Sequence, residues 1–181
     1  TNHLLFDVDP FDNWTDNQFP TFNWVASRGS VARRDYTTAN SPAGGFWSTS
    51  YAVIRKCNLV IKNSEAIPGI TDEEKKALIG QAKFLRAYWY STLANYFGGV
   101  PLIDVPLDRT SDEEIFYARS TYDQTISFIQ KDITDALALL PDAWSGNDKG
   151  RATKGAALAL KSEVELYAGK WQDCVPSANA V

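Results

Sequence analysis

The stretch AKFLRAYWYSTLANYFGGVPLI, residues 82–103, decides the fold of this chain of 181 residues. It carries most of an apolar stripe whose members are spaced by three and four residues, which is typical of one face of an α-helix. The stripe consists of Leu78, Ala82, Leu85, Trp89, Leu93 and Tyr96. Gly98 and Gly99 then end the helix, because glycine readily adopts the left-handed conformation of a C-cap. We therefore predict that the rings of this stripe belong to a core and not to a binding surface.

The same helix has a well-marked start and room for a close neighbour. Thr71 and Glu74 form the pattern of a capping box, in which each side chain bonds a backbone amide that would otherwise be free. The apolar face is widened by Phe84, Tyr88 and Phe97. The small residues beside it are Gly80, Ala87, Ser91 and Ala94. They allow a second helix to approach closely.

Three further segments show the same helical period. The first begins at Phe46, is closed by Pro68-Gly69, and carries Trp47, Tyr51, Ile54, Asn58 and Ile61. The second begins near Ser120 or Thr121, is stopped by Pro141, and carries Tyr122, Ile126, Ile129, Ile133, Leu137 and Leu140. The third follows Thr153, ends at Gly169, and carries Ala157, Leu160, Val164 and Tyr167. The connection before Ser120 is longer than usual and begins with the extended residues 100–103.

These patterns predict a mainly α chain of TPR-like antiparallel helix pairs with little sheet, because no alternating strand pattern of any length is present. Residues 1–43 are predicted to be an irregular, loop-rich segment and residues 44–169 a helical-repeat region. Residues 170–181 are predicted to start a further helix, in which Pro176 is awkward. A helical repeat normally ends in a polar capping unit, and we identify none in this sequence. We therefore interpret residues 1–181 as a single but incomplete helical domain.

Composition excludes several classes of function. A net charge of -4 and a pI near 5.0 provide no basic field for a nucleic-acid backbone. His3 is the only histidine, and Cys57 and Cys174 lie in no metal-binding or redox pattern, so we expect no metal and no cofactor. The two cysteines are expected to be buried free thiols, with a disulfide in an oxidising compartment as the alternative.

The chain is also predicted not to cross a membrane by itself. No apolar run approaches the roughly 20 residues that a membrane-spanning helix needs. The chain begins at Thr1 and contains no Met, so we interpret it as a processed or partial chain.

Four stretches in order carry a resemblance to a known family. They are FWSTSYAVIRKCNLVIKN, AKFLRAYWYSTLANYFGGVPLI, ARSTYDQTISFIQKDITDALALLP and GRATKGAALALKSEVELYAGKW. With their spacing, they resemble the SusD/RagB family of outer-membrane nutrient-binding lipoproteins over roughly residues 46–172, and Asn58 stands in the position usual for that family.

The resemblance implies a helical protein with TPR-like pairs on one side and a loop-rich face on the other. It implies a cell-surface location on the bacterial outer membrane, through an acylated N-terminal cysteine that is not present in this chain. It also implies a SusC-like TonB-dependent transporter as partner, an oligosaccharide or sometimes a peptide as ligand, and no covalent chemistry.

The irregular N-terminal segment supplies the residue types that bind sugars. Flat rings cover the apolar faces of pyranoses, and amides, carboxylates and Arg bond their hydroxyls. The predicted platforms are Trp14, Trp24 and Tyr36. The predicted hydroxyl partners are Asp12, Asn13, Asp16, Asn17 and Arg28. The alternative is that Trp14 and Trp24 only pin this segment onto the helices, since Trp is usually well buried.

Two other functions remain as rivals at this stage. A peptide- or protein-binding helical-repeat module, including the peptide-importing branch of the same family, would need a groove lined by Asn, Arg and acidic residues. A glycan-active enzyme would need two facing carboxylates, for which Asp12 with Asp16, or Glu113 with Glu114, are the candidates. We expect no enzyme activity. Trp144, among small polar residues, is a further candidate for contact with a partner or ligand.

Overall fold

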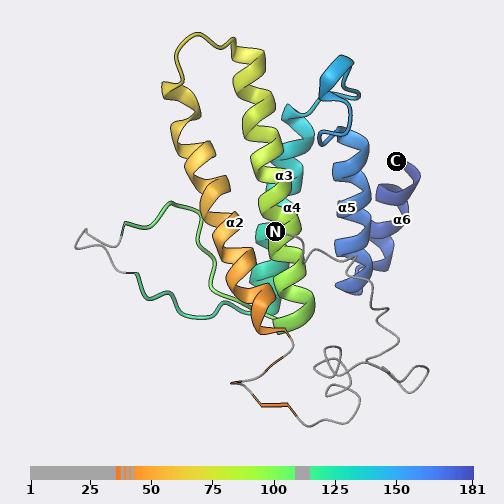
Figure 1. Cartoon of the computed structure of the whole chain (residues 1–181). Coiled ribbons are helices and arrows are strands. Elements are labelled where there is room, and N and C mark those ends of the chain that lie inside the picture. Colours follow the sequence, from red (N-terminus) through yellow and green to blue (C-terminus); the bar gives the residue numbers. More distant parts are fainter. Residues whose placement is uncertain (1–35, 38, 40, 42, 109–114) are drawn as a thin grey trace, which may run out of the picture. The chain divides into compact units, whose positions relative to one another are not determined.

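The computed structural model of the chain describes residues 36–37, 39, 41, 43–108 and 115–181 (Figure 1). The chain divides into two compact units, Thr1–Gly45 and Phe46–Val181. The second, which we call the helical unit, contains nearly all of the described residues. Its architecture is therefore treated by itself.

The described residues form helices and contain no β-strand, so the prediction of a mainly α fold with little sheet is confirmed. The α-helices are α2 (Gly44–Asn63), α3 (Asp72–Phe97), α4 (Tyr122–Leu139), α5 (Lys154–Tyr167) and α6 (Trp171–Asn179). Two short 3-10 helices are η3 (Ser64–Ala66) and η4 (Gly146–Asp148). Within the described ranges, no helix is both long and apolar enough to span a bilayer.

Successive helices pack antiparallel, as the predicted helix pairs require (Figure 1). Between α3 and α4, for example, Lys83 pairs with Asp135 and Arg86 with Asp132, so residue numbers rise on one helix as they fall on the other. Contacts of Trp47 with Phe97 and of Tyr51 with Tyr90 show the same for α2 with α3. Helix α5 runs antiparallel to α6 and is bonded to it through Lys161 and Ser177 (Figure 1). Each helix thus buries its stripe against its neighbours in the chain.

The helix starts follow from local side-chain chemistry. The Glu74 backbone N–H donates to the Thr71 hydroxyl at 3.2 Å, and the Thr71 N–H donates to the Glu74 carboxylate at 2.7 Å, which confirms the predicted capping box. Thr121 and Gln124 form a second capping box at the start of α4. Pro176 lies inside α6 without ending it. Pro176 lacks the N–H that would bond the Gln172 carbonyl, so it removes one backbone donor from α6.

The core lies among α2, α3, α4 and α5 and contains the predicted rings. Trp89 is 6% exposed, and Leu93 is fully buried. Phe84, Tyr88 and Phe97 are partly buried and pack against the core, as predicted. The fully buried members from four helices include Ile54, Tyr90, Leu93, Ile129, Ile133 and Ala157.

The predicted burial is wrong for two residues of the apolar stripes. Leu85 is 43% exposed, because the inner face of α3 is centred on Arg86 and Tyr90, which the apolar period alone would leave outside the stripe. Tyr167 is 64% exposed, although the other stripe residues of α5 are at most 5% exposed. Tyr167 is the last residue of α5, where the helix ends beyond the tightly packed part of the core.

The connection between α3 and α4 crosses the helices as an extended strap, which we define as residues 98–108. The Tyr90 hydroxyl accepts a hydrogen bond from the Ile103 N–H at 2.7 Å and donates to the Ile103 carbonyl at 3.2 Å. The Tyr51 hydroxyl donates to the Pro101 carbonyl at 2.8 Å. The side-chain amide of Asn58 donates to the carbonyls of Ile103 and Val105. The helices therefore supply the partners that a sheet would otherwise give this extended backbone.

Arg86 joins the strap to three helices from a buried position, where it is 5% exposed. Its guanidinium makes two hydrogen bonds of 2.7 Å to the Asp132 carboxylate on α4 and one of 2.7 Å to the Asn58 side-chain oxygen on α2. It also donates to the Asp104 carbonyl in the strap at 3.2 Å. Burial alone would lower the pKa of Arg86, but the hydrogen bonds and charge of Asp132 and the nearby Tyr90 and Asp104 together raise it. Arg86 is therefore a permanent cation in the core.

Replacing Arg86 by Leu should lower the free energy of unfolding by about 3–5 kcal/mol, because it leaves the buried Asp132 carboxylate without its main partner. The double variant Arg86→Leu/Asp132→Leu should recover most of this loss, since it removes both charges. Urea unfolding followed by circular dichroism measures both. Lys131→Ala, which breaks an exposed ion pair to Asp135, is the control and should cost less than about 1 kcal/mol. A loss for Arg86→Leu no larger than that of the control would contradict the prediction.

Gly99→Ala should destabilise the helical unit by about 3 kcal/mol. A Cβ at Gly99 would overlap the backbone of Ser120 and Thr121, where the strap meets the start of α4, and backbone cannot turn aside as a side chain can. The matched control is Gly155→Ala in α5, where the nearest atom to an added Cβ is 3.8 Å away. Thermal unfolding should show a lower midpoint for Gly99→Ala only; equal midpoints for the two variants would refute the close approach.

Candidate functional site

Seven of the eight predicted sugar-binding residues lie outside the described residues. These are Asp12, Asn13, Trp14, Asp16, Asn17, Trp24 and Arg28. Tyr36 is described and is 46% exposed. The predicted site of the N-terminal segment therefore stays a prediction, and so do the carboxylate pairs Asp12 with Asp16 and Glu113 with Glu114, which lie outside the described ranges as well.

The buried acids of the helical unit already have structural partners. Asp132 is bound by Arg86, and Lys83 lies 3.8 Å from it. Glu165 is 1% exposed and pairs with Lys161 at 2.8 Å. Among the described residues, no group of three or more His, Cys, Asp or Glu side chains could hold a metal ion. The Arg86–Asp132 pair joins α3 to α4, whereas the Lys161–Glu165 pair lies within α5 and is linked to α4 by a hydrogen bond that Gln130 donates to Glu165 at 3.4 Å.

The two cysteines are free thiols in different surroundings. Cys57 is buried, as expected, whereas Cys174 is only partly buried. Burial raises the pKa of Cys57 to about 11, and the charge of Asp132 adds to this effect. A thiol with such a pKa is protonated at neutral pH and is a poor nucleophile.

Trp144 holds a loop together. Its indole N–H donates to the Ala152 carbonyl at 2.8 Å, and the Arg151 guanidinium lies 5.7 Å from its ring centroid. It is half-buried beside η4. These contacts give Trp144 a structural role in closing the connection between α4 and α5.

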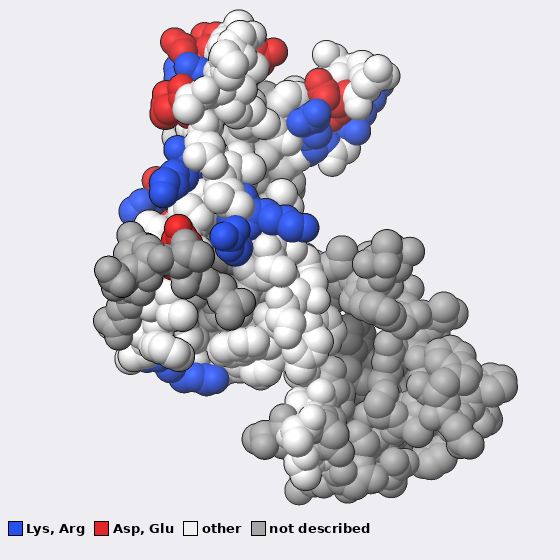
Figure 2. All heavy atoms as spheres, turned by 60° about the vertical axis from the view of Figure 1, so that its left-hand side comes forward, with Lys and Arg blue, Asp and Glu red and all other residues white. Residues whose placement is uncertain are grey.

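Charged side chains are unevenly distributed over the surface. Figure 2 shows one face on which Lys and Arg lie across the middle, while Asp and Glu gather at the upper end, where α2 and α3 are joined. Helix α2 carries Arg55, Lys56 and Lys62 and no acidic residue. All three cations are exposed.

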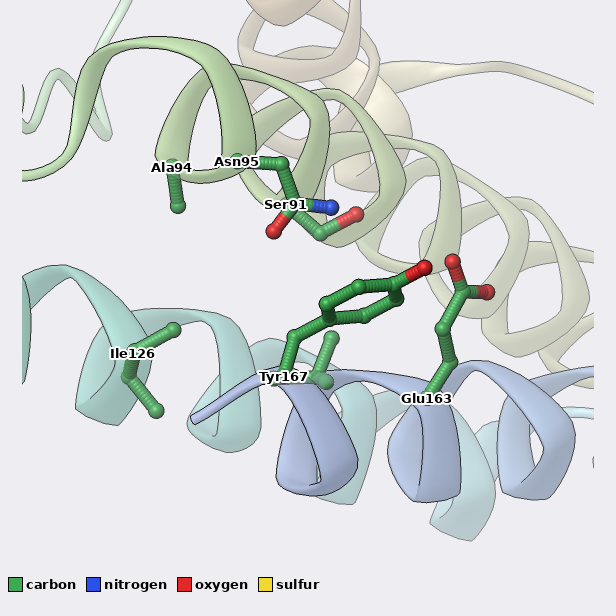
Figure 3. Close-up of a pocket in the computed structure, with 7 residues that line it drawn as sticks. Ser91, Ala94, Asn95, Ile126, Glu163 and Tyr167 are labelled. Atoms are coloured by element: carbon green, nitrogen blue, oxygen red, sulfur yellow. The ribbon is translucent and has the colours of Figure 1, made fainter. Parts of the chain in front are cut away.

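A small hollow between α3 and α5 combines a ring with polar groups (Figure 3). It is lined by Ser91, Ala94, Asn95, Ile126, Glu163, Val164 and Tyr167. Figure 3 shows the Tyr167 ring lying between the two helices, with Ser91 and Asn95 above it and its hydroxyl end toward the Glu163 carboxylate. The interior of the hollow has room for about one water molecule. Larger ligands could therefore lie only across its mouth.

The electrostatics at this hollow are negative. Burial raises the pKa of the nearby Tyr88 hydroxyl, and the charge of Glu163 raises it further. Glu163 itself is exposed and has no ion pair with any of the described residues. Sequence analysis missed this site because Tyr167 was placed on a buried stripe; no local signal marks it, since it forms only where α3 and α5 meet.

Comparison with known proteins identifies the family. The SusD-like family model, described as starch-binding and associating with the outer membrane, matches residues 7–166. The chain belongs to the SusD-like family. This confirms the resemblance inferred from the four sequence stretches. It also accounts for the helical pairs, because solved SusD-like structures share them.

Individual SusD-like proteins support the assignment. A SusD-like protein from Bacteroides fragilis superimposes with a TM-score of 0.87 at 32% identity, over 94% of this chain and 33% of that one. A laminarin-binding SusD-like protein gives a TM-score of 0.76 at 28% identity, over 84% of this chain and 32% of that one. SusD-like protein P25 of Formosa agariphila is 24% identical over 91% of this chain and 28% of its own length. The chain thus spans about a third or less of each of these three relatives.

The difference between the two thiols can be measured directly. At pH 8 the native chain should react with about one equivalent of a disulfide reagent quickly, because only Cys174 is accessible and Cys57 remains a buried thiol. Cys174→Ser should then show almost no rapid reaction, and unfolding in urea should expose both thiols of the natural chain. Rapid reaction of two equivalents without denaturant would show that Cys57 is not protected.

Proposed function

We propose that this chain is part of a surface glycan-binding protein that delivers oligosaccharides to a SusC-like TonB-dependent outer-membrane transporter. The observation that carries the proposal is the SusD-like match over residues 7–166, with its description as starch-binding and outer-membrane-associated. Its likeness to a laminarin-binding SusD-like protein, at 28% identity and a TM-score of 0.76, supports a glycan as ligand.

The ligand is bound without covalent chemistry. The buried carboxylates Asp132 and Glu165 form ion pairs with Arg86 and Lys161, which give both a structural role in the helical unit. A protein that delivers nutrient to a pore gains nothing from cleaving it there. Weak binding is enough, because a binder held beside the pore keeps its ligand at a high effective concentration.

The primary ligand site is assigned to the irregular N-terminal segment. Trp14, Trp24 and Tyr36 provide sugar platforms, and the polar side chains between them bond hydroxyls. The longer protein would be held on the outer face of the outer membrane by an N-terminal lipid anchor outside this chain. Its helical pairs would then act as a rigid support for the loop-rich binding face.

Titration calorimetry with a panel of oligosaccharides tests this function. The chain should bind at least one glycan, and Trp14→Ala or Trp24→Ala should weaken that binding about tenfold or more, which corresponds to about 1.4 kcal/mol for a lost ring. Phe116→Ala is the control, because Phe116 is an 84% exposed ring on the connection between α3 and α4. It should leave the affinity unchanged.

Three outcomes separate the proposals. Unchanged affinity in both Trp variants would refute the assigned site while leaving glycan binding intact. Binding of peptides but of no glycan would favour the peptide-importing branch. Release of reducing sugar on incubation with the oligosaccharides would refute the non-enzymatic role.

A further inference from the structure

The ring at the end of α5 is exposed and does not belong to the hydrophobic core that the described residues form. Tyr167 is 64% exposed, whereas Leu160 and Val164, one and two turns earlier on the same stripe, are 5% and 3% exposed. The helix thus buries its apolar face until its last residue, where a large ring remains on the surface. A lone exposed ring is common, so its surroundings decide whether it matters.

Those surroundings combine the apolar side chains of Ala94, Ile126 and Val164 with polar groups that are open to solvent. Asn95 on α3 and Glu163 on α5 are both exposed, line the hollow beside Tyr167, and form no side-chain hydrogen bond or ion pair with any described residue. Ser91 donates its hydroxyl proton to the Tyr88 carbonyl at 2.7 Å, so its oxygen remains free to accept another hydrogen bond. The hollow therefore presents a flat ring, an amide, a carboxylate and a hydroxyl acceptor within one small area (Figure 3).

We propose that Tyr167, Ser91, Asn95 and Glu163 form a second sugar-binding site, which takes one pyranose unit of a neutral glycan. This inference rests on the proposed function, and it concerns a site in the helical unit that is distinct from the N-terminal platforms. The apolar face of the pyranose packs on the Tyr167 ring. The Glu163 carboxylate accepts hydrogen bonds from neighbouring hydroxyls, and the Asn95 amide both donates and accepts.

The size of the hollow fixes how the sugar lies. Its interior holds about one water and no pyranose ring, so the sugar lies across the mouth with one hydroxyl or hydroxymethyl group reaching inward. Because the ring stays on the surface, the site can bind a residue within a long chain as well as at its end. This suits a glycan that also contacts another part of the protein.

The charge of Glu163 decides the class of sugar. No described cation pairs with Glu163, so a uronate or sulfate group at the mouth would face an uncompensated negative charge. None of the α2 cations Arg55, Lys56 and Lys62 lines this hollow. The site therefore selects neutral glycans over anionic ones.

The test measures binding of a neutral and an anionic oligosaccharide to the chain by calorimetry. A hexamer of β-1,3-linked glucose and one of α-1,4-linked glucose serve as neutral probes, and oligogalacturonate is the anionic probe. Tyr167→Ala should weaken neutral binding about fivefold to tenfold, whereas Tyr167→Phe, which keeps the ring, should stay within about twofold. The matched control is Tyr117→Ala, since Tyr117 is a 40% exposed tyrosine away from the hollow.

Asn95→Ala provides an independent test, because it removes the proposed hydrogen bonds to the sugar at an exposed position that does not contribute to the core. It should also weaken neutral binding several-fold, and Glu163→Gln should reduce the preference for neutral over anionic probe. Neutral binding by the natural chain that is unaffected by both Tyr167→Ala and Asn95→Ala would overturn this site and leave the proposed function standing. Tighter binding of the anionic probe would overturn the neutral class. Absence of glycan binding by the natural chain would instead refute the proposed function.

Discussion

The buried ion pair between Arg86 and Asp132 is the interaction on which the rest of the helical unit depends. A charge in the core is costly unless its partners are fixed, and Arg86 satisfies its guanidinium with groups from α2, α4 and the strap. The bidentate contact also sets the register of α3 against α4, because the planar guanidinium donates two parallel hydrogen bonds to a carboxylate in only one geometry. One side chain thus fixes the relative positions of three helices and a long connection.

The fixed positions of α2 and α3 in turn hold the strap in place. Its extended backbone is bound by Tyr51, Asn58 and Tyr90, all of which lie on α2 or α3. Burial raises the pKa of Tyr90 to about 12, so its hydroxyl keeps the proton that it donates to Ile103. A chain of ring contacts, from Trp47 through Tyr51 to Tyr90, packs beside the strap. The aromatic residues of α2 and α3 therefore serve to hold irregular backbone in place.

A rigid helical support with irregular segments attached is well suited to glycan recognition. At the proposed N-terminal site, the sugar would bind to aromatic rings of the N-terminal segment. At the hollow beside Tyr167, it would bind to side chains from α3 and α5. Two separate weak contacts with one long, neutral chain add their binding energies when the geometry allows both at once. Such a protein could hold many different glycans of the same charge class without a deep pocket for any of them.

The sequence by itself determined where helices begin, where they end and that the Trp89 ring faces inward, but not that Tyr90 is buried or that Tyr167 is exposed. Capping boxes, the Gly98-Gly99 stop and the period of Trp89 and Leu93 are local features, so they need no knowledge of neighbours. The tertiary structure decided what the period could not: that Arg86 is buried while Leu85 is exposed, and that Tyr167 meets Asn95 at the surface. The physical reason is that a charge is buried only when distant segments supply its partners, and a surface site forms only where two helices meet. The predicted N-terminal site rested on residue types alone, since an irregular segment has no period from which the direction of its side chains can be deduced.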